Sequence, residues 1–287
     1  MPRAALIIIS IIMLAVLLLI IIPFIATAVF SRNVKKEVAD FFGSEVENKG
    51  EIIQNSDLEG LPSSVQKWLK SSQVVGKEKI RTVRLKQEAS MRLKEDGNWM
   101  PVEAEQYFRT DEPGFIWKAK VKMVPLLYFT GRDKYIEGRG NMLIKLLSLI
   151  KVADSSGKEI DQGTLLRYLA ETVWFPTSAL NSYIKWEEVD AGSARATMSY
   201  GGVTASGVFT FNEKGEVINF EAERYGEFNG QYRLEKWSVQ MRDHKDFNGI
   251  RIPAGGEVIW KLKTGDFSWY QFEIKEIEYN KPAVYED

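Results

Sequence analysis

After residue 80, apolar and polar side chains alternate along most of the chain. Residues 114–123 show this most clearly, because every second side chain is apolar and three lysines stand between them. A period of two is typical of a strand with one dry and one solvated face. Similar runs occur at 82–93, 100–108, 193–199, 203–211, 216–225, 232–241, 256–263 and 267–279.

The connections between these runs predict how the strands pair. Turn signals rich in glycine and asparagine separate many of them, as at 200–202, 212–215 and 264–266. Because such connections are too short for a helical crossover, neighbouring strands are expected to be antiparallel. About ten or eleven strands would strain an open sheet, so we predict a mainly β fold that curls into a half-barrel.

One segment in the middle of the chain, 162–175, has helical periodicity. Asp161 is expected to cap this helix and Pro176 to end it. The preceding segment, 141–152, fits a strand or a helix, and the even spacing of its lysines favours a strand. We expect the helix to fill the concave side of the sheet with an apolar stripe formed by Leu165, Leu166, Leu169 and Val173.

Residues 4–30 form an apolar run without a charged side chain. The run exceeds the roughly 20 residues that cross a bilayer as a helix. A cleaved signal peptide is the alternative, because residues 26–28 have the small-residue spacing of a cleavage site and Pro23 is expected to break the helix before it. The apolar stretch before Pro23 is longer than the hydrophobic region of a signal peptide, which favours an uncleaved transmembrane anchor at residues 1–31.

The rest of the chain divides into a connector and one domain. Residues 32–56 are expected to be the connector, with helical spacing at 34–42 followed by a polar, loop-like stretch. Residues 57–287 are then a single β half-barrel domain that begins with a short helix after Leu61.

The charges and rare residues exclude several functions. With 38 basic and 39 acidic residues, the chain has no basic excess for binding nucleic acid. It contains no cysteine, which excludes disulfides, thiolate metal sites and cysteine nucleophiles. His244 is the only histidine, and its place beside a turn at 247–249 predicts a surface position. Gly138 and Gly140 are not followed by the third glycine of a dinucleotide-binding fingerprint. Residues 131–142 instead indicate a tight hairpin. We expect no cofactor and no metal.

Residues 60–280 include the segments LPSSVQKWL, GFIWKAKV, GRDKYIEGRGNM, RYLAETVWFPTSAL and FNGIRIPAGGEVIW. Through these segments the chain resembles a family of bacterial and archaeal proteins of unknown function. The plan of strands, helix and strands is also similar to that of the LolA/LolB lipoprotein-localisation carriers and other periplasmic lipid carriers. That similarity implies an incomplete barrel closed by helices around a hydrophobic cavity. It also implies a domain on the outer side of the cytoplasmic membrane, although Arg3 before the apolar run and Arg32, Lys35 and Lys36 after it leave the orientation open.

Arg167 and Glu171 are four residues apart on the predicted helix and can form an ion pair. The ordinary interpretation is a pair that faces solvent or the rim of the barrel, where such pairs are weak. A second interpretation places the pair at a cavity mouth, where it orients a ligand headgroup. A third makes Glu171 a catalytic acid, for which the sequence shows no partner. Trp117, Trp174 and Phe175 are expected to divide between core and cavity lining.

These patterns predict a membrane-anchored half-barrel that binds a lipid or another hydrophobic ligand and is not an enzyme. Its partners would be that ligand and the bilayer around residues 4–30. The alternatives are a filled barrel that serves as a structural or protein-interaction module of the cell envelope and, third, an unidentified enzyme. The candidate ligand-binding residues are Arg167, Glu171, Trp174, Phe175 and Trp117.

Overall fold

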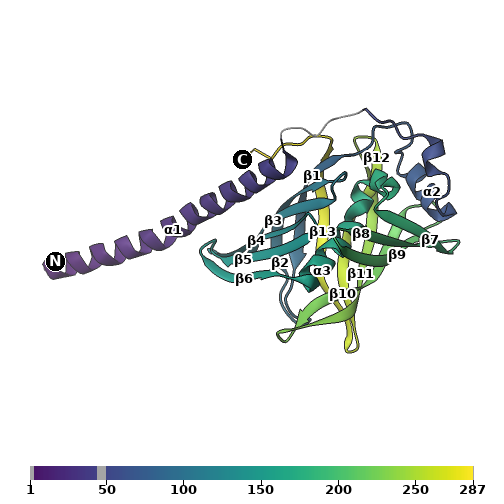
Figure 1. Ribbon diagram of the computed structural model, residues 1–287. Helices are drawn as coiled ribbons and strands as arrows, with labels where there is room; N and C mark the ends of the chain where they lie inside the picture. Colours follow the sequence, from purple (N-terminus) through teal and green to yellow (C-terminus); the bar gives the residue numbers. More distant parts are fainter. Residues whose placement is uncertain (1–2, 44–49, 287) are drawn as a thin grey trace.

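The computed structural model describes residues 3–43 and 50–286 (Figure 1). Within these residues one antiparallel sheet of 13 strands curls around a helix. The first strand group comprises β1 (Thr82–Met91), β2 (Met100–Arg109), β3 (Gly114–Val124), β4 (Leu127–Ile136), β5 (Arg139–Leu146) and β6 (Ile150–Ser156). The second comprises β7 (Ile184–Asp190), β8 (Ser193–Tyr200), β9 (Val203–Phe211), β10 (Val217–Phe228), β11 (Gln231–Phe247), β12 (Ile250–Leu262) and β13 (Gly265–Tyr279).

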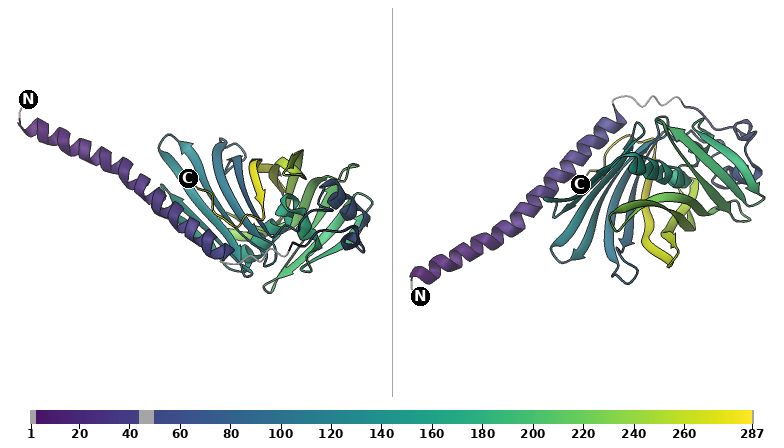
Figure 2. Two further views of the ribbon diagram at one scale, coloured as in Figure 1. Left: turned by 90° about the horizontal axis from the view of Figure 1, so that it is seen from above. Right: turned by 60° about the horizontal axis from the view of Figure 1, so that its bottom comes forward.

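The strand order is β6-β5-β4-β3-β2-β1-β13-β12-β11-β10-β9-β8-β7, so β1 and β13 pair in the middle of the sheet. The two edge strands, β6 and β7, are joined by α3 (Lys158–Glu171) and by two 3-10 turns, η2 (Thr172–Trp174) and η3 (Pro176–Leu180). Helix α3 contacts β4, β5 and β6 of one half and β8, β9 and β10 of the other. It therefore bridges the two halves on the concave side of the curled sheet (Figure 2).

Helix α3 buries the apolar stripe that its sequence predicts: Leu165, Leu166 and Leu169 are fully buried, and Val173 lies in the turn that follows. On the β7–β9 side, α2 (Ser63–Ser71) fills the space under the sheet, where its Trp68 ring stacks on Phe209 at 6.0 Å. A short 3-10 turn, η1 (Asn55–Leu58), precedes it. The core is thus continuous under both halves of the sheet.

The fold class predicted from the alternation is confirmed, and the described residues contain more strands than the ten or eleven expected. Residues 141–152 are not one strand, because Leu147 and Ser148 adopt φ values of 53° and 60° and turn the chain between β5 and β6. The tight hairpin at 131–142 is confirmed as β4–β5. The helix begins at Lys158, before the predicted start. Asp161 is therefore no cap: it lies inside α3 and accepts a hydrogen bond from the Gly140 amide at 2.7 Å.

Helix α1 (Arg3–Phe42) is continuous through Pro23, which does not break it. Its last third packs on the outer face of the sheet through Phe30, Val34, Val38, Phe41 and Phe42, against Tyr107, Ile116 and Tyr285. The first part of the predicted connector is thus helix bound to the domain, whereas residues 44–49 of that connector lie outside the described residues. The segment from Arg3 is long and apolar enough to cross a membrane.

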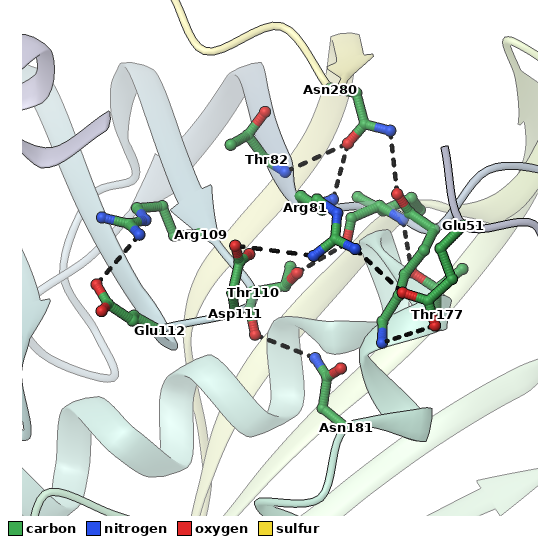
Figure 3. A network of polar contacts seen from close by, with 12 residues as sticks. Glu51, Arg81, Thr82, Arg109, Thr110, Asp111, Glu112, Thr177, Asn181 and Asn280 are labelled. Atoms are coloured by element: carbon green, nitrogen blue, oxygen red, sulfur yellow. Dashed lines mark hydrogen bonds and ion pairs between the residues drawn. The ribbon is translucent and has the colours of Figure 1, made fainter. Parts of the chain in front are cut away.

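Polar contacts tie together the end of the half-barrel at which β1 begins and β13 ends (Figure 3). Asn280 accepts hydrogen bonds from the amides of Arg81 and Thr82 at 2.7 and 3.4 Å. The Arg81 guanidinium pairs with Glu51 at 3.0 Å. From the 3-10 turns, Thr177 accepts a hydrogen bond from the Ile80 amide at 3.0 Å. This network joins the entry segment, the sheet and the chain after α3 at one end of the half-barrel.

Candidate functional site

A cavity of about 390 Å³ lies between the sheet and the C-terminal part of α3. Aromatic rings close it on the side of the polar network just described. Phe175 is fully buried there, with its ring 4.7 Å from Phe108 and 5.5 Å from Tyr168. At the other end the lining reaches Leu93 and Val152, which are 64% and 57% exposed. The cavity therefore opens at the end of the half-barrel opposite the network.

Small side chains make the floor of the cavity. Ala119 and Gly131 occupy paired positions on β3 and β4, and a branched or aromatic side chain in this row would fill the space. The next rows toward the opening carry Val121 and Phe129. Because the residues on this face are apolar, the floor suits a hydrocarbon chain.

Four polar side chains meet at the inner end of this floor. Arg167 of α3 donates from Nε to Glu171 Oε1 at 2.8 Å and from Nη1 to Asp133 Oδ2 at 3.0 Å. The Gln106 amide donates to Glu171 Oε2 at 2.7 Å. The Arg167 guanidinium also lies 4.9 and 5.0 Å from the ring centroids of Phe115 and Trp117. The inner end is thus a charge cluster beside the apolar floor of the cavity.

Burial controls the ionisation of this cluster. It raises the pKa of Glu171, although Arg167 and Gln106 oppose the shift, and it raises the pKa of Asp133 against the effect of Arg167. Burial also acts to lower the pKa of Arg167, but Glu171 and Asp133 outweigh it, so that this pKa is raised. Arg167 therefore stabilises the ionised forms of Asp133 and Glu171, whereas burial favours their protonated forms.

Arg224 of β10 is a second guanidinium at the cavity wall. Its Nε donates to the Gly163 carbonyl at 3.2 Å, and its guanidinium lies 5.1 Å from the Trp237 ring centroid. Burial and the neighbouring Arg167 lower the pKa of Arg224 to about 10. Among residues 3–43 and 50–286, Arg224 forms no ion pair. The indole N–H groups of four tryptophans in the cavity lining have no hydrogen-bond partner in the same ranges: Trp117, Trp174, Trp237 and Trp269.

The structure brings four of the five candidate site residues to the cavity: Trp117, Arg167, Glu171 and Trp174. Phe175 belongs to the closed aromatic end and does not line it. The solvent-facing interpretation of the ion pair is wrong, because the side chains of Arg167 and Glu171 are only 18% and 12% exposed. Sequence reasoning did not identify Gln106, Asp133 and Arg224.

His244 is not the surface residue that its neighbouring turn predicts. It lies on β11 opposite Pro253, and its side chain is 8% exposed. Its Nδ1 lies 4.0 Å from Glu216 Oε2, and burial lowers the pKa of the imidazole. Across the described part of the chain, no group of three histidine, aspartate or glutamate side chains is arranged to hold a metal ion.

Several solved structures are similar to this chain at low sequence identity. A lipoprotein-sorting protein domain from Vibrio parahaemolyticus is 8% identical, with a TM-score of 0.38, and the match covers 70% of this chain and 86% of that one. A LolA superfamily protein from Nitrosomonas europaea is 9% identical, with a TM-score of 0.41 and coverages of 76% and 93%. A DUF1329 family protein from Desulfovibrio piger is 9% identical, with a TM-score of 0.39 and coverages of 76% and 92%.

Two of these structures carry the names of the lipoprotein-sorting and LolA proteins to which the plan of the sequence was compared. No curated protein matches the chain by sequence. The profile of a family of unknown function matches residues 51–272, which includes most of the half-barrel and every residue of the charge cluster. The chain therefore belongs to the DUF6544 family.

Proposed function

We propose that the half-barrel binds a lipid or another hydrophobic ligand in the cavity between the sheet and α3. The cavity itself is the observation that carries this proposal. It has about 390 Å³ of space, within the range of small-molecule sites, and apolar side chains line most of it. The alternative of a filled barrel that serves only as an interaction module requires side chains in this space, whereas Ala119 and Gly131 leave it open.

The ligand is an amphiphile with oxygen acceptors at one end. Its chain lies along the apolar floor, and its polar end meets Arg224 at the cavity wall. A hydrogen bond from this guanidinium to a ligand oxygen is charge-assisted and therefore stronger than one between neutral groups. We propose binding without catalysis, because the Arg167 guanidinium engages both Asp133 and Glu171, the two carboxylates that could act as general acid or base.

We propose that α1 remains attached as a single membrane anchor. A signal peptidase would have to cut near residues 26–28, but Thr27 is helical and its hydroxyl contacts Tyr128 of the domain at 2.6 Å. Cleavage there would remove a segment that the domain holds. The outer side of the cytoplasmic membrane stays a prediction from the resemblance to lipid carriers.

Titration of the full chain in detergent with a chain-brominated fatty acid tests ligand binding. Residues 1–42 contain no tryptophan, so quenching of indole fluorescence reports on the domain. We expect saturable quenching, because four tryptophans line the cavity. Arg224→Met should weaken binding of the acid more than binding of its methyl ester, since only the acid presents a charged headgroup. Quenching that rises linearly with probe and never saturates would contradict the proposal.

A further inference from the structure

Two hairpin tips expose a compact apolar surface beside α1. The β3–β4 tip contributes Met123, Val124 and Leu126, which are 37%, 58% and 82% exposed. The β5–β6 tip contributes Leu149, Ile150 and Val152, which are 45%, 61% and 57% exposed. We refer to these six residues as the tip patch. Exposed apolar side chains gathered in this way usually mark an interaction surface.

Hydrogen bonds fix the tip patch at one level along α1. The Thr27 hydroxyl lies 2.6 Å from the Tyr128 hydroxyl, beside the β3–β4 tip, and 2.9 Å from the Ser148 hydroxyl in the β5–β6 tip. Leu149 also lines a groove of about 370 Å³ with Ile22 and Ala26 of the helix. Figure 1 shows the β5–β6 tip beside the middle of α1. The helix therefore leaves the domain at the tips.

The length of free helix beyond this level matches a bilayer. The 23 residues from Ala4 to Ala26, which precede Thr27, extend about 35 Å at the rise of an α-helix. The hydrocarbon core of a bilayer is about 30 Å thick. If the apolar helix spans this core, Thr27 and the two hairpin tips lie at its boundary.

We propose that the tip patch docks in the surface of the bilayer that α1 spans, so that the half-barrel sits against the membrane instead of hanging from a flexible tether. This inference rests on the proposed anchor and does not require a ligand in the cavity. Apolar side chains at this depth enter the boundary between headgroups and acyl chains, as in interfacial membrane proteins.

Lysines around the patch identify an anionic lipid surface as the best partner. Lys120 lies with its ammonium 4.3 Å from the Tyr128 ring centroid, and Lys145 lies 6.0 Å from the Phe30 ring centroid. Lys122 and Lys151 flank the two tips, where they pair with Glu103 and Asp154. Long lysine side chains can keep their stems along apolar surface and direct their charge to headgroups.

Docking also brings the cavity to the bilayer. Val152 belongs to the tip patch and also lines the cavity. Ile144 and Phe129, on the neighbouring strands, line the cavity beside it. The apolar surface is therefore continuous from the membrane boundary into the cavity. A lipid chain that leaves the bilayer at the β5–β6 tip reaches the cavity without crossing water.

Depth-dependent quenching in liposomes tests the docking. The chain has no cysteine, so single substitutions Val124→Cys, Ile150→Cys and Lys214→Cys can each carry an environment-sensitive fluorophore. The full chain is reconstituted in phosphatidylcholine with phosphatidylglycerol, with a nitroxide high on the acyl chain of a fraction of the lipid. We expect strong quenching and a blue shift at positions 124 and 150. Lys214, in the exposed turn before β10, serves as the control and should show neither.

Two further comparisons make the result decisive. Introducing Leu126→Asp and Leu149→Asp into the Ile150→Cys protein should abolish the quenching, because charged side chains resist burial in acyl chains. Equal, weak quenching at positions 124, 150 and 214 would overturn the proposal. Quenching at the tips without saturable ligand binding would refute the proposed function and support the docking. Saturable ligand binding without quenching at the tips would refute the docking and support the proposed function.

Discussion

Replacing Gly131 by leucine is expected to remove ligand binding and leave the fold intact. A Cβ at this position meets only Trp117 Cζ3, at 3.5 Å, which is an ordinary contact. The rest of a leucine side chain must then extend over the floor of the cavity between Ala119 and Ile144. We expect the affinity for the brominated fatty acid to fall at least tenfold, or by about 1.4 kcal/mol.

Gly131→Ala is the matched control, because a single methyl group fits the same space and leaves most of the cavity open. Glycine weakens a strand interior, so neither substitution should lower the melting temperature of the protein much. Unchanged affinity in Gly131→Leu, measured with a protein that melts like the wild type, would show that the probe binds elsewhere.

The second large effect is expected from Arg167→Met, which leaves Asp133 and Glu171 without their shared cation. Removing one partner of a buried ion pair costs about 3–5 kcal/mol, because the remaining charge stays desolvated. Denaturant unfolding at neutral pH, followed by tryptophan fluorescence, should show a loss of this size. A pair that contributed only as much as an exposed one would lose less than about 1 kcal/mol.

The loss should depend on pH. Burial raises the pKa of Asp133 and Glu171, so the folded state holds their protons more tightly than the unfolded state does. Their contribution to the free energy of unfolding is then largest at acid pH and falls as pH rises through the folded-state pKa values. Without Arg167 the free energy of unfolding falls more as pH rises. The stability difference between the wild type and Arg167→Met should therefore shrink on acidification.

Adding Asp133→Asn and Glu171→Gln to Arg167→Met is the control, because it removes both unpaired charges. This triple variant should recover much of the lost stability at neutral pH and lose the extra pH dependence. A deficit that stays constant between acid and neutral pH would contradict the role assigned to the carboxylates.

The sequence predicts the curled sheet and its helix because both depend on local periodicity. Alternation places Val102, Ala104 and Phe108 on the dry face of β2, and Gln106 interrupts that series as an inward polar residue. Arg224 follows Phe220 and Ala222 on β10 in the same way. In the sequence, a polar side chain at a position where the alternation predicts an inward-facing apolar one was thus the signal that could have identified these site residues.

Other features depend on pairing between distant segments, which periodicity does not encode. Asp133 reaches Arg167 only because β4 and α3 lie on opposite sides of one cavity. The His244 side chain is 8% exposed and lies beside Glu216, although its sequence neighbours are polar. Phe175 and Trp174 are adjacent in sequence, but the 3-10 turns direct only Trp174 to the cavity.

The central claim is that the cavity holds a hydrophobic ligand, and native mass spectrometry of the full chain tests it most directly. The wild type and Gly131→Leu are purified from membranes in the same detergent, so that lipid bound around α1 is common to both. We predict that the wild type retains about one additional lipid-sized mass per chain after the detergent is stripped and that Gly131→Leu does not. Identical spectra without such a mass in the wild type would contradict the account.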